Sequence, residues 1–236
     1  MVTHLLLDVA REFTGLRVAS FQTSERILDA AADGSVLVVA TDEQPYVQAY
    51  LSVVFMSVLL TTNNFPVETV YRTGPVWVDS DNAADMVAAC GFSGYPVCDT
   101  TKEGGGGNTT TSSSENVPAG DRRRRQECGC IDRNSAKIVM QTHGTDGNSV
   151  FWGLPKAGAE RAMRDLRLGP RSLYQGLSVF DMGEMAKKIS DIIASKPDGL
   201  AVSIPGGELE NVVRRTAAEN IPVWALNSGN VFAAEW

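Results

Sequence analysis

Residues 180–204 read FDMGEMAKKISDIIASKPDGLAVSI, and this stretch decides the fold. Its first part, 180–196, has the spacing of a helix with one apolar stripe, formed by Met182, Met185, Ile189, Ile192 and Ile193. Its last part, 199–204, is a short apolar run of the kind that forms a strand buried on both faces. A helix that leads directly into such a strand predicts a parallel sheet, because parallel strands need a crossover connection.

The same alternation extends in both directions from this stretch. A helix over 207–220 and a strand over 221–227 are predicted after it, and a strand over 137–143, a helix over 150–166 and a strand over 172–177 before it. Crossovers of this kind are right-handed, so the helices come to lie on both faces of the sheet. The prediction for 137–227 is therefore an α/β fold with an open, doubly wound parallel sheet.

The first part of the chain follows a similar pattern. Residues 1–13 predict an amphipathic helix with Leu5, Leu6, Val9 and Phe13 on its apolar face. Next come a strand over 16–21, a helix over 24–33 with Ser24 as its N-cap, and a buried strand over 36–41. Pro45 begins a long helix to about Thr62, followed by an extended segment over 68–80 and a short helix from Asp81. The helix is apolar nearly all round over 46–60, which predicts deep burial.

Composition changes sharply between these two parts. Residues 93–136 contain GGGG at 104–107, TTTSSS at 109–114 and four arginines at 122–125. Such a segment is too polar to form a core and predicts a long disordered linker. We interpret the arginines as solvated charge, while a nuclear signal, a processing site and a phosphate contact remain alternatives. Asn108 begins a glycosylation sequon, which matters only in a secreted chain.

The four cysteines, Cys90, Cys98, Cys128 and Cys130, lie in or beside this linker. A spacing of one residue between Cys128 and Cys130 is poor for zinc, so no metal site is expected. Two readings stay open. A disulfide between the Cys90/Cys98 and Cys128/Cys130 groups would close the linker in an oxidising compartment, and free thiols are the alternative.

Length and charge exclude some functions. The chain has 236 residues, 43% of them hydrophobic, and a formal net charge of −7. An acidic chain lacks the basic footprint of nucleic-acid binding, and the apolar run at 51–60 is too short and interrupted to predict membrane insertion. The first residues carry no basic segment, so they do not read as a signal peptide.

Candidate ligand contacts follow the predicted strands, because open α/β sheets bind ligands beyond the carboxyl ends of their strands. Two aromatic residues, Phe151 and Trp152, lie close to these strand ends in sequence. Side chains that read hydroxyls, beside rings that stack on C–H faces, suit a sugar or similar polyol. The polar candidates are Gln22, Asp42, Glu43, Gln44, His143, Ser203, Asn227 and Ser228.

Enzyme and cofactor signals are weak by comparison. Asp42 and Glu43 are adjacent, so their side chains diverge and do not flank one glycosidic bond. His143 with Asp146 could act as a base and its orienting group, but no serine or cysteine lies in a nucleophile-elbow context. The glycines at 104–107 follow no strand and form no phosphate loop. The chain is therefore predicted to be a non-enzyme without a cofactor.

Two stretches together resemble the type I periplasmic sugar-binding proteins, the ribose/xylose/galactose-type substrate-binding family of ABC transporters. Residues 137–229 resemble the opening half, through KIVMQTHGTDGNSVFWGLPKAGAERAMRDL (137–166), YQGLSVFDMGEMAKKISDIIASKPDGLAVSIP (174–205) and AAENIPVWALNSG (217–229). Residues 16–82 resemble the closing part, through SFQTSERILDAAADGSVLVVATDEQPYVQAYL (20–51) and TGPVWVDSDNA (73–83). The resemblance implies the two-lobed periplasmic-binding-protein-like fold.

The order of the two stretches is the reverse of the family's. We interpret residues 1–92 as the C-terminal part of one module, 93–136 as a low-complexity linker, and 137–236 as the N-terminal lobe of the next. A circular permutant with a deletion is the alternative. In the family the helix after the position of Pro45 packs back on the first lobe, so 45–80 and 137–230 are expected to form one nearly complete lobe. Residues 1–44 would then be a partial second lobe.

The resemblance also implies ligand positions. Phe151 and Trp152 match the aromatic pair that stacks on the sugar, and His143, Asp146 and Asn148 lie in the loop that touches it. Asn227 and Ser228 stand where an acidic residue and an arginine often occur, while Gln22 and Glu43 replace a usual aspartate and a usual glutamine. These departures leave the ligand's identity open.

The implied function is a non-catalytic solute-binding module for a sugar-like ligand, outside the cytoplasm in the periplasm or at the cell surface. It would serve a transporter or an attached receptor. The alternatives are the ligand-sensing domain of a transcription regulator and a truncated relic that binds nothing. With one lobe and a fragment, the chain alone is predicted to bind weakly or not at all, because closure around a ligand needs two lobes.

Overall fold

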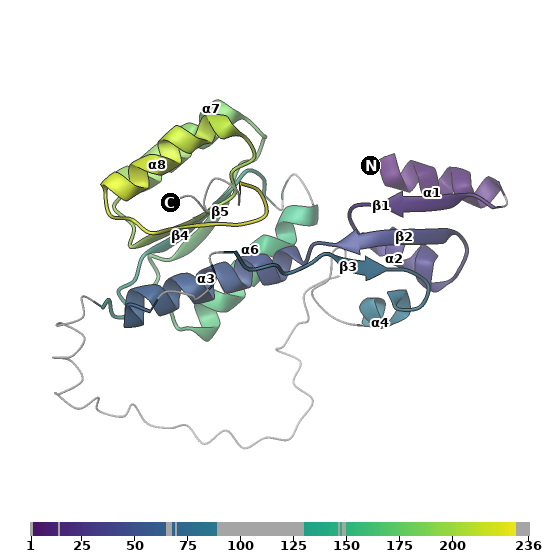
Figure 1. Ribbon diagram of the computed structural model, residues 1–236, viewed down its shortest axis with the longest axis horizontal. Coiled ribbons are helices and arrows are strands. Elements are labelled where there is room, and N and C mark those ends of the chain that lie inside the picture. The colour runs from purple at the N-terminus through teal and green to yellow at the C-terminus, as the bar shows by residue number, and fades with distance from the viewer. Residues whose placement is uncertain are drawn as a thin grey trace, which may run out of the picture.

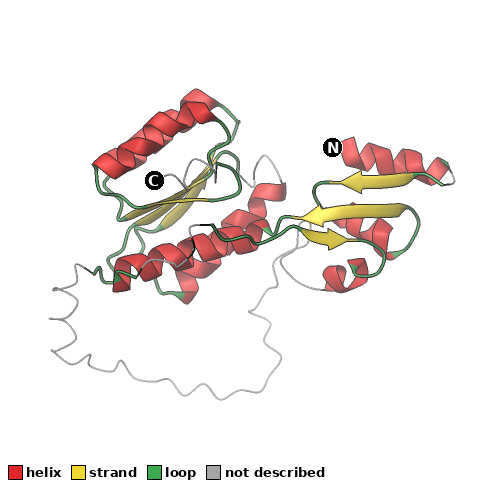
Figure 2. Ribbon diagram, viewed as in Figure 1, coloured by secondary structure: helices red, strands yellow, loops and turns green. Residues whose placement is uncertain are grey.

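The computed structural model describes residues 2–13, 15–64, 68, 70–88, 130–145, 147 and 150–229. Within these residues the strands form two separate sheets, one of three strands and one of four, both flanked by helices (Figure 2). The chain is therefore a mixed α/β protein with parallel strand pairs in both sheets.

The larger sheet consists of β4 (Ile138–Thr142), β5 (Leu173–Gly176), β6 (Gly199–Val202) and β7 (Val223–Ala225). Its strand order is β5-β4-β6-β7, and every pair is parallel. Every residue of the two central strands is buried, as the apolar run at 199–204 predicts for β6. The predicted parallel sheet is confirmed here.

Helices cover both faces of this sheet, because its strands present apolar side chains alternately to either side (Figure 1). Leu200 and Val202 of β6 face α7 (Met182–Ala194), the short 3₁₀ helix Gly207–Leu209 and α8 (Glu210–Ala218). Ala201 faces α3 (Pro45–Thr62) and α6 (Val150–Asp165) instead. The predicted α7 stripe is confirmed: Met185, Ile189, Ile192 and Ile193 are buried, and Met182 packs partly buried against the same core.

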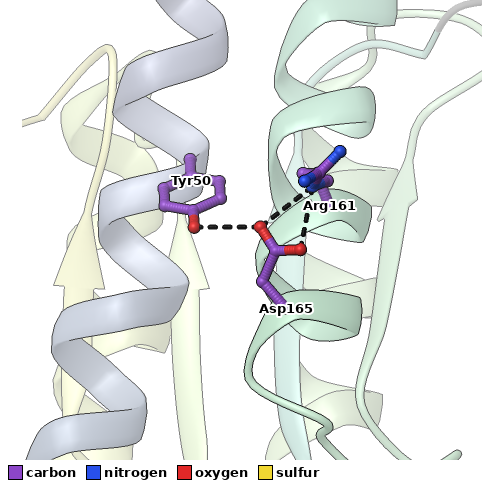
Figure 3. A network of polar contacts seen from close by, with 3 residues as sticks. All are labelled: Tyr50, Arg161 and Asp165. Atoms are coloured by element: carbon purple, nitrogen blue, oxygen red, sulfur yellow. Dashed lines mark hydrogen bonds and ion pairs between the residues drawn. The ribbon is translucent and has the colours of Figure 1, made fainter. Parts of the chain in front are cut away.

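Helix α3 comes from the first part of the chain and packs along α6, as the sequence predicts (Figure 1). The two helices approach closely at Gly158, where a Cβ atom would lie 2.2 Å from the carbonyl oxygen of Tyr46. Toward its C-terminal end, Met56 packs against Gly199 of β6. On the surface, the Tyr50 hydroxyl of α3 donates to Asp165 of α6, which also accepts from Arg161 (Figure 3).

The expectation that α3 is buried nearly all round is wrong. Only one stripe is buried, comprising Pro45, Ala49, Ser52, Val53, Met56 and Ser57, while Val47 and Val58 remain exposed. The reason is that α6 and the sheet cover α3 from one side, with Tyr71 and Trp224 adding ring contacts to Phe55. Among the described helices, α3 alone is long and apolar enough to cross a membrane, and here its buried stripe packs in a protein core.

The smaller sheet consists of β1 (Arg17–Ser20), β2 (Leu37–Asp42) and β3 (Val76–Val78), in that order. One face carries α1 (Val2–Glu12), α2 (Glu25–Ala32) and α4 (Ala83–Ala88), whose apolar side chains share a core with Val18, Val38 and Val78. The predicted N-cap of α2 is confirmed, since the Ser24 hydroxyl accepts from the Ile27 N–H at 3.4 Å. On the opposite face, Val39 and Trp77 are exposed.

Two predictions for this part are corrected. Residues 76–78 do not join the larger sheet with α3. They pair antiparallel with β2, because the chain turns back after α3 and places Val76 beside Asp42. The predicted apolar face of α1 is also wrong: over residues 5–13, whose side chains are described, Leu7 and Ala10 are buried, and Leu5, Leu6, Val9 and Phe13 are exposed. A short helix over a three-stranded sheet buries only a narrow stripe.

The end of the predicted linker is ordered. The Ile131 N–H donates to the carbonyl oxygen of Leu60 at 2.8 Å, and Ala136 is fully buried at the entry to β4. Residues 130–136 therefore belong to the larger sheet's unit, held by main-chain hydrogen bonds that composition alone cannot reveal. Cys130 is in a disulfide bond. The other three cysteines, the sequon at Asn108 and the arginines at 122–125 lie outside the described residues.

Candidate functional site

The site is built on the carboxyl edge of the larger sheet, where β4 and β6 end side by side. His143 follows β4 directly and Ser203 follows β6 directly. The Ser203 N–H still donates to the carbonyl oxygen of Gln141 at 3.1 Å, which continues the pairing of the two strands. The parallel register of β4 and β6 therefore brings these two candidate residues together.

His143 and Ser203 are joined by two hydrogen bonds. The His143 main-chain N–H donates to Ser203 Oγ at 3.1 Å, and His143 Nδ1 lies 2.8 Å from the same oxygen. Ser203 is fully buried and His143 is half-buried. Burial lowers the pKa of His143 below its ordinary value of 6.5, because a charged imidazolium is poorly solvated there. Burial therefore favours the neutral form of the ring.

Two aromatic rings contact His143, and a third packs on one of them. The Trp152 ring lies edge-on to His143 at 4.5 Å between centroids, and the Phe180 ring lies at 5.5 Å. Phe151 meets Trp152 at 5.0 Å, perpendicular to it. Trp152 is only 8% exposed, whereas Phe180 is 55% exposed. The surface available to a ligand is therefore Phe180 and part of Phe151, and Trp152 supports the loop from beneath.

The loop after β4 is packed against its neighbours without space for larger side chains. A Cβ atom on Gly144 would lie 2.1 Å from Nε1 of Trp152, and one on Gly176 would lie 2.0 Å from the carbonyl oxygen of Gly144. Thr142 Oγ1 lies 2.7 Å from the Tyr174 hydroxyl and donates to the Gly144 carbonyl at 2.8 Å. These contacts hold His143 in one place.

Glu43 connects this edge to the smaller sheet. Its carboxylate Oε2 accepts from Asn227 Nδ2, which follows β7, at 3.4 Å. Its main-chain carbonyl accepts from Gln48 Nε2 at 2.7 Å and from Thr73 Oγ1 at 3.2 Å. Two residues predicted from opposite parts of the chain, Glu43 and Asn227, are therefore brought together.

Other predicted residues have local roles. Asp42 is 1% exposed and its Oδ1 accepts from the Gln44 N–H at 3.2 Å, so it orders the turn into α3. Gln44 adopts a left-handed conformation with φ of 55° at the start of that helix. Ser228 lies beside Asn227, and its buried Oγ has no hydrogen-bond partner among the described residues.

The last three predicted residues are Gln22, Asp146 and Asn148. Gln22 is exposed beyond β1, and its main-chain groups bond to Ser20 in a local turn. Asp146 and Asn148 lie outside the described residues. Within the described residues, no three His, Cys, Asp or Glu side chains gather as a metal site requires.

Sequence reasoning missed Phe180, Tyr174 and Gln48. Phe180 follows the strand end of β5, so the rule that selected His143 could have selected it, but it was read as the start of a helix. Gln48 lies one turn into α3, and nothing in its spacing indicates that it would bond back to Glu43.

No protein-family model matches the chain, and a search of curated proteins found no match.

Proposed function

We propose that this chain is a non-catalytic binding module for a sugar or a similar polyol, built on the periplasmic-binding-protein-like fold that its sequence resembles. The observation that carries the proposal is the grouping of the half-buried His143 with the exposed ring of Phe180 at the carboxyl edge of a parallel sheet. That edge is where open α/β sheets bind their ligands.

The chemistry of the cluster supports a polyol. A neutral imidazole can hydrogen-bond a hydroxyl without a charge on the ligand, and the Phe180 ring offers an apolar face for C–H groups. Glu43 and Asn227 add a carboxylate and an amide at the junction of the two sheets. Few polar groups among aromatic rings are typical of small-molecule sites.

The same geometry argues against catalysis by Ser203. Its hydroxyl is fully buried and, among the residues that the structure describes, both of its hydrogen bonds go to His143, so a substrate carbonyl has no approach to the oxygen. A nucleophile needs both a base and an open path to the reacting atom. We therefore favour binding without turnover, serving a transporter or an attached receptor outside the cytoplasm.

The two-lobed architecture belongs to this proposal. The four-stranded sheet with α3 would be one nearly complete lobe, and the three-stranded sheet would be part of the other. Within the described residues, the hydrogen bonds of Gln22 go to Ser20 and not to His143 or Glu43. The smaller sheet therefore contributes few polar groups to the site. We expect weak affinity for the chain alone.

The test is calorimetric titration of the chain with a panel of pentoses and hexoses. We expect weak, saturable heat with at least one sugar and no turnover. The variant Phe180→Ala should lower that affinity about tenfold or more, because it removes the exposed ring, a loss of about 1.4 kcal/mol or more. Val179→Ala is the matched control, since Val179 is the exposed neighbour at 68%.

No heat with any sugar would overturn binding and favour a relic. Turnover of a sugar would overturn the non-catalytic assignment. Equal affinity in Phe180→Ala and Val179→Ala would remove Phe180 from the site.

A further inference from the structure

The buried hydroxyl of Ser203 allows one assignment of its proton. Ser203 is fully buried. Within the described residues, the only hydrogen-bond partners of its hydroxyl are the main-chain N–H and the Nδ1 atom of His143. The main-chain N–H can only donate, so Ser203 Oγ accepts there. The remaining hydroxyl proton has a single acceptor within reach, which is His143 Nδ1.

The opposite assignment leaves a donor unsatisfied. If Nδ1 carried the proton, Ser203 Oγ would accept twice, and its own hydroxyl proton would have no acceptor in the described part of the chain. Leaving a buried donor without a hydrogen bond is unfavourable by about 1–3 kcal/mol. The neutral ring therefore keeps its proton on Nε2, and Nδ1 stays an acceptor.

The other ring nitrogen, Nε2, is the one left for a ligand. In an imidazole ring Nε2 points away from Nδ1, and no group in the described part of the chain hydrogen-bonds Nε2. The rings of Trp152 and Phe180 both pack against the imidazole. The position and direction of the Nε2–H group are thus set before any ligand arrives.

We propose that Ser203 is a positioning residue, and not itself a ligand contact: it holds His143 as an Nε2–H donor, so the ligand must present an acceptor oxygen at this point. The part of this inference that concerns the ligand rests on the proposed binding function. The part that concerns the tautomer of His143 does not. A ring, hydroxyl, carbonyl or carboxylate oxygen would satisfy the Nε2–H. A group that only donates, such as an ammonium, would leave it unpaired.

The first experiment needs no ligand. The chain has two histidines, so the variant His4→Gln leaves the imidazole of His143 as the single histidine signal. Long-range ¹H–¹⁵N NMR correlation at neutral pH should identify Nε2 as the protonated nitrogen and Nδ1 as the unprotonated one. A protonated Nδ1 would overturn the proposal. This measurement is made with Ser203 unmutated.

The second experiment removes the hydroxyl. Ser203→Ala should move both ring ¹⁵N shifts toward an averaged mixture of the two tautomers, whereas unchanged shifts would overturn the positioning role. Ser172→Ala is the matched control, because Ser172 Oγ also bridges two strands, accepting from Ile138 and donating to Ala136 at the other end of the sheet. It should leave the His143 signals in place.

The binding step separates the two proposals. With any sugar that binds, Ser203→Ala should lower the affinity about tenfold and Ser172→Ala less than twofold; equal losses would overturn the link between Ser203 and the ligand. If no sugar binds, the proposed function fails, while the NMR result still decides whether Ser203 positions His143.

Discussion

His143 provides a pH-dependent test at the scale of one residue. Burial holds its pKa in the folded protein below 6.5, so the unfolded chain takes up protons more readily in the interval below that value. Stability from this group is complete above pH 6.5 and falls as the pH drops from 6.5 to the lowered pKa. We expect urea unfolding to show less stability at about pH 5.5 than at about pH 7.5.

Carboxylates also titrate as the pH falls, so the comparison needs the variant His143→Gln. This variant should lose less stability between the two pH values than the wild-type chain does, because glutamine does not titrate. An equal or larger loss in the variant would show that charging His143 is not opposed by the fold.

Gly144 tests how tightly the loop after β4 is packed. In Gly144→Ala the new methyl group would meet the Trp152 ring, which is buried and has no room to move aside. We expect a loss of about 1–3 kcal/mol in the free energy of unfolding, measured in urea. Gly147→Ala lies in the same loop with only an ordinary contact at 3.8 Å, and it should change stability far less. Equal effects would place the cost in the backbone and not in the ring contact.

The residue scale also shows what the sequence could predict of the site. The rule that ligands meet strand ends selected His143, Ser203 and Asn227, and the structure places all three at the carboxyl edge of the larger sheet. The rule could not predict which residue contacts a ligand and which one supports the site. Whether a ring stacks on a ligand or supports a loop depends on burial, and the burial of Trp152 follows from the missing side chain of Gly144.

At the scale of elements, regular periodicity predicted well where one face is wholly covered. The stripe of α7 is buried as read, because α7 lies flat on a four-stranded sheet. The faces of α1 and α3 were misjudged, since both sequences offer apolar residues on more than one side and the covering elements come from elsewhere in the chain. The antiparallel pairing of β3 with β2 could not be predicted from the sequence either, because it depends on the turn of the chain after α3.

The contact between α3 and α6 depends on Gly158. A methyl group there would meet the main chain of Tyr46, which has no freedom to rotate away. Gly158→Ala should therefore push the helices apart and lower the free energy of unfolding by about 2 kcal/mol or more, despite the better helix propensity of alanine. Thermal or urea unfolding followed by circular dichroism would measure the loss.

Gly183→Ala is the matched control within a helix. Gly183 is exposed in the first turn of α7, and its new Cβ would approach only the Asp181 side chain at 3.3 Å. This variant should change stability little or raise it by a few tenths of a kcal/mol, roughly as helix propensity suggests. If Gly158→Ala behaves in the same way, the two helices do not depend on close main-chain approach.

At the scale of the whole molecule, α3 ties together segments from the two ends of the chain. It begins where β2 of the smaller sheet ends, and its buried stripe contributes Ala49 and Val53 to the core of the larger sheet. The two parts are separated in sequence by the 41 residues 89–129, which lie outside the described ranges. The sequence therefore indicated this association only through the family resemblance of the two parts. The core of the smaller sheet shares no residue with the other cores.

Separate cores predict two unfolding transitions in calorimetry. Leu28 is fully buried in the smaller sheet's core, and Met56 of α3 is 2% exposed against β6. Truncating either to alanine should cost about 2–5 kcal/mol, but in different places. Leu28→Ala should lower the temperature of one transition and Met56→Ala that of the other, because each cavity weakens only its own core. A single transition that both variants shift equally would mean that the junction through Glu43 and α3 couples the two sheets into one cooperative unit.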